Sequence, residues 1–123
     1  MKSSFVKIMK DPKVYIGSAG KKGRGVFAKR PLKKGEILES SPYIEIPPRD
    51  GRKLTDTIIN SYWYDLDSKS AAIGLGLTSL YNHSENPSAK FSINRRRKMI
   101  TITAIRNILP KEEISVHYGY KLG

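Results

Sequence analysis

Short runs rich in apolar, β-branched and aromatic residues open the chain, and such runs are typical of β-strands. Two such runs lie at residues 5–9 and 14–17, and the Asp11-Pro12 pair between them indicates a turn. A loop with three glycines follows at residues 18–25, and a strand-like run resumes at residues 26–28. We therefore expect the chain to begin with strands.

Extended segments are also expected through the middle and the end of the chain. Residues 36–39 and 42–48 predict two further extended runs, and a proline pair ends the pairing there. Residues 71–81 contain two glycines and predict extended or irregular chain that packs closely on a neighbour. Residues 91–93 and 99–105 alternate around a run of basic residues, which predicts a hairpin with a basic tip.

A helical pattern stands out at residues 54–66, where apolar side chains recur every three or four positions. The apolar positions are Leu54, Ile58, Ile59, Tyr62, Trp63 and Leu66. An amphipathic helix that begins near Thr55 or Asp56 would give this spacing. The whole pattern predicts a mainly-β fold with one or two short helices.

The length of 123 residues fits a single domain, residues 1–123. The chain has no cysteine, which excludes disulfides, and with His83 and His117 as its two histidines we predict no metal site. Its apolar runs are shorter than the roughly 18 residues that span a bilayer, and residues 1–10 contain no export leader. We therefore predict no membrane partner and a cytoplasmic location, or a host nucleus if the source is a virus or an intracellular pathogen.

The net charge of +12 is unevenly distributed. Residues 1–35 carry eleven Lys and Arg against one acid, residues 36–94 carry five against eight, and residues 95–123 carry seven against two. A basic outer surface attracts nucleic acid through phosphate contacts with little sequence preference. A solvated face that keeps the protein soluble explains the same charge, so both interpretations stay open.

Three polar stretches interrupt the strand pattern. Residues 81–87 read Tyr-Asn-His-Ser-Glu-Asn-Pro, which suits a tight, hydrogen-bonded loop. Residues 23–28 read Gly-Arg-Gly-Val-Phe-Ala, and residues 112–120 read Glu-Glu-Ile-Ser-Val-His-Tyr-Gly-Tyr. Taken singly, the glycines fit a hairpin turn, the first histidine fits a turn cap, and the alternate tyrosines fit a half-buried strand.

Taken together, the three stretches resemble the SET-domain protein lysine methyltransferases, and most of all the minimal SET proteins of bacteria and viruses. The resemblance spans about residues 14–120. It implies the SET-domain β-clip fold of several small sheets with a C-terminal pseudoknot, and an inserted variable region at about residues 48–72. It also implies transfer of a methyl group from S-adenosyl-L-methionine to a lysine.

The resemblance further implies roles for particular residues. Tyr118 is the expected catalytic residue, and the expected cofactor-binding residues are Lys22, Gly23, Arg24, Gly25, Asn82, His83 and Tyr118. The expected lining of the lysine channel is Tyr62, Tyr81 and Tyr120, with Tyr64 as a substitute for Tyr62. Packing in the core is an equal alternative for Tyr81 and Tyr120. In many relatives, an aromatic residue at the position of Val116 limits how many methyl groups one lysine receives. Because this chain has valine there, mono-, di- and trimethylation are all left open.

The implied substrate is a lysine-bearing basic protein such as a histone or chromatin-like protein. Acidic residues of the middle segment are predicted to bind it by charge complementarity. They include Glu36, Glu39, Glu45, Asp56, Asp65 and Asp67.

Because few residues follow Tyr120, we hypothesise that a second subunit, as in a homodimer, closes the lysine channel. The alternative functions are a catalytically weak SET module that binds nucleic acid or protein, and a small basic β-protein of ribosomal or nucleoid type.

Overall fold

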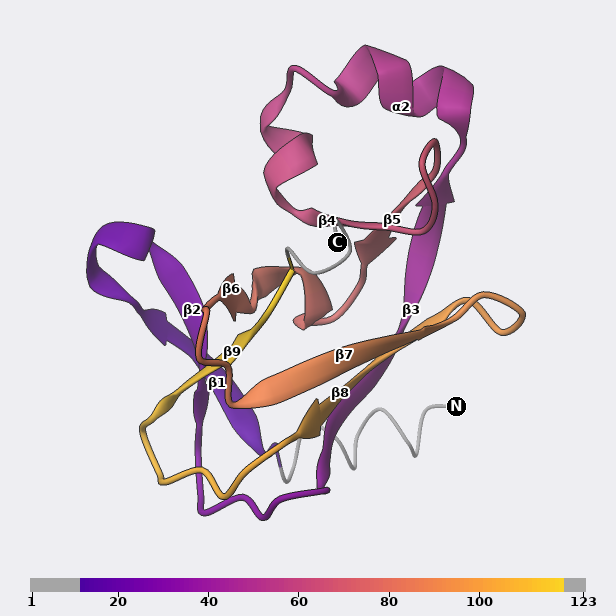
Figure 1. The fold of residues 1–123 in the computed structure, drawn as a ribbon. Helices are drawn as coiled ribbons and strands as arrows, with labels where there is room; N and C mark the ends of the chain where they lie inside the picture. The colour runs from indigo at the N-terminus through magenta and orange to yellow at the C-terminus, as the bar shows by residue number, and fades with distance from the viewer. Residues whose placement is uncertain (1–11, 119–123) are drawn as a thin grey trace.

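The computed structural model describes residues 12–118, which form two sheets and one α-helix (Figure 1). The first sheet has the strand order β1-β2-β9-β6, and its strands are β1 (Val14–Ser18), β2 (Arg24–Ala28), β9 (Glu113–Val116) and β6 (Asn82–His83). The 3-10 turn η1 (Gly20–Lys22) joins the antiparallel strands β1 and β2. Gly20 and Gly23 have φ values of 65° and 85° there, which glycine adopts without steric cost. The glycine loop is thus a hairpin connection.

The second sheet has the strand order β4-β5-β3-β8-β7. Its strands are β4 (Trp63–Asp65), β5 (Ala71–Gly74), β3 (Ile37–Ile46), β8 (Met99–Ala104) and β7 (Ala89–Asn94). The 3-10 turn η3 (Thr78–Leu80) links β5 to β6. β7 and β8 are antiparallel over their full lengths, so the predicted hairpin with a basic tip is confirmed.

β3 is one continuous strand, so the prediction of two separate extended runs at residues 36–39 and 42–48 is wrong. The polar residues between the two runs stay in the ladder to β8, with Ser40 opposite Thr101 and Ser41 opposite Ile100. The register shifts earlier, between Ile37 and Glu39. Pairing with β5 on the other edge keeps the strand extended as far as Ile46.

The predicted helix at residues 54–66 is also wrong. The helix α2 (Pro48–Leu54) ends where that helix was expected to begin, and the 3-10 turn η2 (Ile58–Ser61) and the strand β4 follow. Pro48 suits the first helical turn, where its missing N–H would have no intrahelical partner. Ile58 is 71% exposed, so the apolar spacing does not mark a core-facing stripe. Tyr64 is 1% exposed and pairs as a strand residue with Ala72, as its β propensity favours.

One hydrophobic core joins the two sheets. Val26 and Ile114 enter it from the first sheet, and Ile100 and Ile102 enter it from the second. Burying one such side chain stabilises a fold by about 1.5–3 kcal/mol. The core therefore fixes how the two sheets, and the loops that connect them, lie against each other.

The C-terminal strand β9 inserts between β2 and β6 (Figure 1). It is antiparallel to β2, with Ile114 opposite Val26, and parallel to β6, with Ser115 opposite Asn82. The three polar stretches singled out in the sequence thereby become neighbours. The mainly-β prediction with one or two short helices is confirmed.

Some predictions are not decided by the fold. The strand at residues 5–9 and the channel residue Tyr120 lie outside the described residues. The single domain at 1–123 and the inserted region at 48–72 stay predictions, and the latter range contains α2, η2 and β4. Within residues 12–118, no helix is both long and apolar enough to cross a membrane.

Candidate active site

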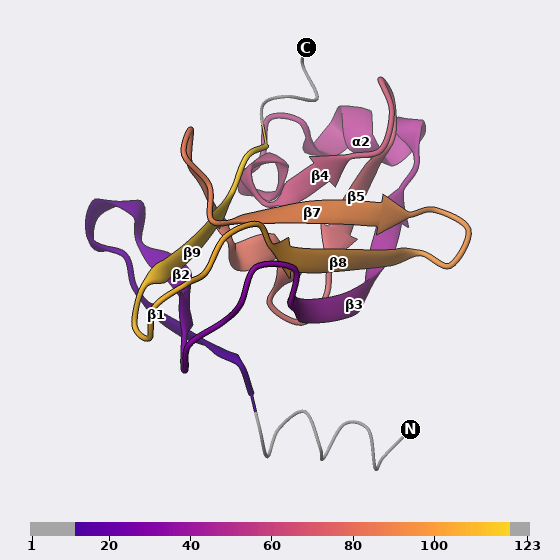
Figure 2. The ribbon, with the colours of Figure 1, turned by 60° about the horizontal axis from the view of Figure 1, so that its bottom comes forward.

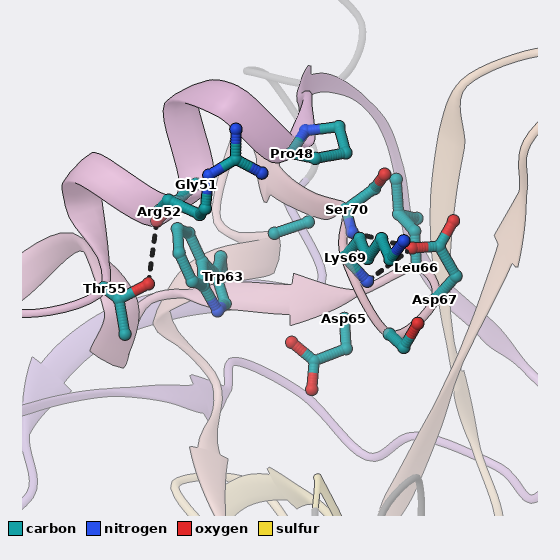
Figure 3. Close-up of a pocket in the computed structure, with 12 residues that line it drawn as sticks. Pro48, Gly51, Arg52, Thr55, Trp63, Asp65, Leu66, Asp67, Lys69 and Ser70 are labelled. Atoms are coloured by element: carbon teal, nitrogen blue, oxygen red, sulfur yellow. Dashed lines mark hydrogen bonds between the residues drawn. The ribbon is translucent and has the colours of Figure 1, made fainter.

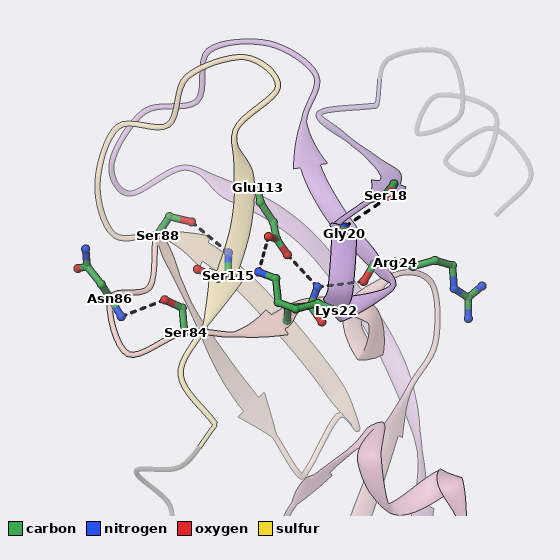
Figure 4. A network of polar contacts seen from close by, with 10 residues as sticks. Ser18, Gly20, Lys22, Arg24, Ser84, Asn86, Ser88, Glu113 and Ser115 are labelled. Atoms are coloured by element: carbon green, nitrogen blue, oxygen red, sulfur yellow. Dashed lines mark hydrogen bonds and ion pairs between the residues drawn. The ribbon is translucent and has the colours of Figure 1, made fainter.

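The three polar stretches meet through a network of charged and amide groups (Figure 4). The Asn82 side-chain amide donates to the Arg24 carbonyl at 2.9 Å and to Oε2 of Glu113 at 2.8 Å. The other carboxylate oxygen of Glu113 accepts a hydrogen bond from Nζ of Lys22 at 2.6 Å. One side chain from β6, one from β9 and one from η1 are thus held at a single point.

Gly25 on β2 makes this approach possible. A Cβ atom at Gly25 would lie 2.7 Å from Oε2 of Glu113 and 2.9 Å from Nδ2 of Asn82. Both distances are shorter than side-chain contacts allow, so any larger residue would push the amide and the carboxylate apart. Gly25 is buried.

A pocket of about 510 Å³ opens beside this network. Its lining includes Lys22, Gly23, Arg24, Tyr62, Tyr81, Asn82, His83 and Tyr118. Every predicted cofactor-binding residue except Gly25 therefore lines one pocket. Ser61, Ser79 and Leu80 also line it, although no motif in the sequence points to them.

Tyr118, the predicted catalytic residue, is held from several sides. Its backbone N–H donates to Nδ1 of His83 at 2.9 Å, and its hydroxyl donates to the carbonyl of Tyr81. The Tyr64 ring packs edge-on against the Tyr118 ring, with centroids 5.2 Å apart, and the Phe91 ring lies 6.1 Å away. The position of the Tyr118 hydroxyl is therefore set by its neighbours.

Burial controls the protonation of the tyrosines at this site. Desolvation raises the pKa of Tyr118, while the neighbouring Tyr64 hydroxyl acts in the opposite direction. Desolvation also raises the pKa of Tyr64 and of Tyr81, and for Tyr81 the nearby Glu39 carboxylate adds to the effect. All three hydroxyls stay protonated at neutral pH and act as hydrogen-bond donors.

His83 belongs to an exposed cluster with Glu85 and His117, whose potential ligand atoms lie within 4.8 Å of one another. Because Nδ1 of His83 accepts the Tyr118 N–H, the proton of the neutral ring is on Nε2, which lies 2.8 Å from Oε2 of Glu85. A metal ion at Nε2 would have to displace that proton and disturb the bond to Tyr118. The absence of a metal stays a prediction.

The two tyrosines considered for the lysine channel lie in different surroundings. Tyr62 follows η2, is 38% exposed and lines the pocket, whereas Tyr64 is buried and donates to the carbonyl of Thr78. The prediction that Tyr62 lies on a helix face is wrong. Tyr62 lies between η2 and β4, and from there it lines the pocket. Its role in the channel stays a prediction.

A second and larger pocket, of about 800 Å³, lies between α2 and the β4–β5 turn (Figure 3). It is lined by Trp63 and by both acidic and basic side chains, among them the predicted substrate-binding acids Asp65 and Asp67. None of the predicted catalytic, cofactor-binding or channel residues belongs to it. Most acids of the middle segment do not form a free acidic surface. Glu45 and Asp67 pair with Arg95, and Glu36 pairs with Lys13 and Arg30.

Comparison with known proteins assigns the chain to a family. The SET-domain family model matches residues 23–119, and the chain belongs to the SET-domain family. The chain is 28% identical over 115 residues to a Schizosaccharomyces pombe histone-lysine N-methyltransferase specific for lysine 37 of histone H3, with 93% of this chain and 78% of that protein covered. A crystal structure of a candidate histone methyltransferase from Plasmodium falciparum matches with a TM-score of 0.73 and 31% identity, covering 89% of this chain and 96% of that chain.

The comparisons and the fold agree on the class of protein. The SET fold class is confirmed. The C-terminal pseudoknot that the resemblance implies stays a prediction. The predicted enzyme class, protein-lysine methyltransferase, is confirmed at the level of the family. Enzymes of this class generally use S-adenosyl-L-methionine. The interpretation as a small ribosomal or nucleoid protein with accidental motifs is thereby excluded.

Proposed function

We propose that this protein transfers a methyl group from S-adenosyl-L-methionine to the side-chain nitrogen of a lysine in a histone or similar basic protein. The observation that supports this proposal most strongly is that Lys22, Asn82 and Glu113 meet beside a pocket lined by Tyr118. The similarity to a histone H3 methyltransferase supports the choice of substrate.

The residues present fit this cofactor. The pocket volume of about 510 Å³ suits a ligand of its size. Asn82 donates its side-chain amide hydrogens to the Arg24 carbonyl and to Glu113. Its Oδ1 can therefore accept a hydrogen bond from the ammonium group of the ligand. The backbone of Gly23 and Arg24 forms the neighbouring wall. When bound, S-adenosyl-L-methionine would supply a methyl group carried on a sulfonium.

The chain's own residues would prepare the lysine. A free lysine has a pKa of about 10.4, and only its neutral form has the lone pair needed for attack. The rings of Tyr62 and Tyr118 line the pocket and would remove water from the amine, which disfavours its charged form. The Tyr118 hydroxyl, fixed by the Tyr81 carbonyl, would orient the reacting nitrogen. Rate acceleration would come from positioning and electrostatics.

A methylation assay tests the proposal. Purified protein is incubated with core histones and S-adenosyl-L-methionine, and methylated lysines are identified by mass spectrometry. We expect transfer by the wild type and a loss of about 10²-fold in kcat for Tyr118→Phe, the order of effect that follows from removing one oriented hydrogen-bonding group. Tyr15→Phe, on the exposed face of β1, is the matched control and should keep full activity.

A catalytically weak SET module is the second candidate function, favoured by the exposed lysines outside the pocket. It predicts salt-sensitive binding to nucleic acid together with loss of cofactor binding. A wild type that binds DNA but does not bind S-adenosylhomocysteine would therefore select this candidate over the enzyme.

We further infer that a second copy of the chain covers η2. Ile58, Ile59 and Tyr62 are 71%, 37% and 38% exposed and lie together beside the pocket, where a partner subunit could complete the lysine channel. Sedimentation should show a dimer that Ile58→Asp dissociates together with loss of activity. An active monomer would rule this out.

A further inference from the structure

The acids of the described residues are mostly engaged within the fold. Those with an ion-pair or hydrogen-bond partner are Glu36, Glu39, Glu45, Asp50, Asp67, Glu85, Glu112 and Glu113. Between residues 12 and 118, the cations without an acidic partner therefore determine the electrostatic character of the surface. They are not evenly spread.

Two loops at the end of the molecule opposite α2 hold one group of these cations (Figures 1 and 2). They are residues 29–36, between β2 and β3, and residues 105–112, between β8 and β9, and we call them the basic loop pair. Leu32 and Ile108 join the loops by reciprocal backbone hydrogen bonds of 3.0 Å and 2.8 Å, and both side chains are buried. The loops are therefore fixed side by side.

Backbone contacts also bring the lysines of the two loops onto one surface. The Lys111 N–H donates to the carbonyl of Ala28, next to Lys29, at 2.7 Å. The Lys34 N–H donates to the side chain of Asn107 at 2.9 Å. Lysines from both loops thus lie where the two loops meet.

The charge of this surface is strongly positive. The basic loop pair contains six Lys and Arg and two acids, which gives a net charge of +4. Both acids are already engaged, Glu36 by Arg30 and Glu112 by Arg106. Lys29, Lys33, Lys34 and Lys111 are exposed, and none has an acidic partner in the part of the chain that the structure describes. Four free ammonium groups therefore face solvent together.

We propose that the basic loop pair is a binding surface for the phosphodiester backbone of double-stranded DNA. Several lysines on a fixed surface suit phosphates, because each contact releases condensed counterions and none requires a particular base. None of the residues that line the candidate cofactor pocket belongs to these loops. DNA could therefore be held while the pocket stays open to a protein substrate.

Fluorescence anisotropy with a labelled, mixed-sequence duplex of about 25 base pairs tests the proposal between 50 and 200 mM salt. Four phosphate contacts predict a slope of about −3.6 for log K against log salt, or roughly 150-fold weaker binding across this range. The variant Lys29→Glu/Lys33→Glu/Lys34→Glu/Lys111→Glu should bind at least about tenfold more weakly at 100 mM salt, with a shallower slope. Neither cofactor nor substrate protein is present, so the result is independent of the proposed methyl transfer.

A matched control changes the charge equally at another place. Lys53→Glu/Arg96→Glu/Arg97→Glu/Lys98→Glu reverses four exposed cations on α2 and in the β7–β8 turn, and it should keep affinity within about threefold of the wild type. An equal loss in both variants would assign the binding to net charge and overturn the proposal. Binding to poly-glutamate as tight as binding to DNA would overturn it too, in favour of an acidic protein partner. Thermal unfolding verifies that each variant folds, and the same four Lys→Gln changes replace the reversal if it does not.

Discussion

Glu39 on β3 accepts a hydrogen bond from the Tyr81 hydroxyl at 3.0 Å, and the Tyr81 carbonyl accepts one from the Tyr118 hydroxyl. The other Glu39 oxygen is held by the Leu77 N–H at 2.7 Å and by the Ser41 hydroxyl at 2.9 Å. Glu39 is therefore a positioning residue for Tyr118, because it fixes the segment on which the Tyr118 hydroxyl depends.

We expect Glu39→Ala to lower kcat about tenfold, since Tyr118 would lose its fixed partner, and to leave the affinity for S-adenosylhomocysteine within about twofold. Glu39→Gln keeps an acceptor for the Tyr81 hydroxyl and should retain most of the activity. Glu45→Ala, on the same strand but paired with the surface residue Arg95, is the control. Steady-state kinetics measure kcat for the three variants. An unchanged kcat in Glu39→Ala would contradict the positioning role of Glu39.

Gly25→Ala should separate Asn82 from Glu113, because the added Cβ has no room between them. We expect a loss of about 1–3 kcal/mol in the free energy of unfolding, together with loss of cofactor binding. Gly51→Ala in α2 is the control, since its Cβ would meet its nearest neighbour at 3.7 Å and should leave stability unchanged or raise it slightly. Denaturant unfolding of both variants measures the difference, and equal behaviour would refute the packing argument.

Lys111 has a φ of 70°, and it follows Pro110 in a turn closed by the Glu112 N–H and the Leu109 carbonyl at 3.1 Å. Glycine is favoured at such a position. We expect Lys111→Gly to raise stability by about 0.5–1 kcal/mol, the relief of left-handed strain less the entropy of glycine. The same variant should weaken DNA binding, because it removes a cation of the basic loop pair.

Lys33→Gly removes a cation from the same loop pair at a position without a positive φ, so it should not stabilise the protein. If thermal unfolding gave both variants the same change, the strain at Lys111 would not be the cause.

The pairing of Glu112 with Arg106 predicts a pH dependence of stability. The Arg106 hydrogen bond holds the pKa of Glu112 below its usual range, with a further contribution from the Leu109 N–H. A carboxyl with a lowered folded-state pKa stabilises the fold above its unfolded pKa of about 4.3, and this contribution is lost as the pH falls through the folded value. At pH 7 the wild type should unfold about 2–5 °C above Glu112→Gln.

That difference should shrink as the pH falls below the unfolded pKa of about 4.3, and it should vanish below the lowered folded-state pKa, where the carboxyl is protonated in both states. Arg106→Gln should lose the same advantage at pH 7. A difference between wild type and Glu112→Gln that did not change with pH would contradict the ion pair as its source.

The site could be predicted from the sequence because its residues come in short local motifs. Asn82 and His83 are adjacent, and Tyr118 follows Glu113 closely. Their resemblance to family motifs can therefore be recognised from the sequence without knowledge of the fold. Glu39 could not be found in this way. Its contact to Tyr81 spans 42 positions and arises from the path of β3, which no local pattern specifies.

The helix predicted at residues 54–66 failed for a related reason. Ile58, Ile59 and Tyr62 have helical spacing, but they are exposed, and the spacing does not reveal whether a core lies on that side. Tyr64 instead follows its tertiary partners, Ala72 on β5 and the Tyr118 ring. Periodicity predicts an element reliably only when the apolar face it identifies is the one that becomes buried.

The most direct test of the account is calorimetric titration of the protein with S-adenosylhomocysteine. The account predicts binding by the wild type, retained binding by Tyr118→Phe, and loss of binding by Asn82→Ala with its folding verified by thermal unfolding. Absence of binding by the wild type would contradict the assignment of the pocket that Lys22, Asn82 and Tyr118 line.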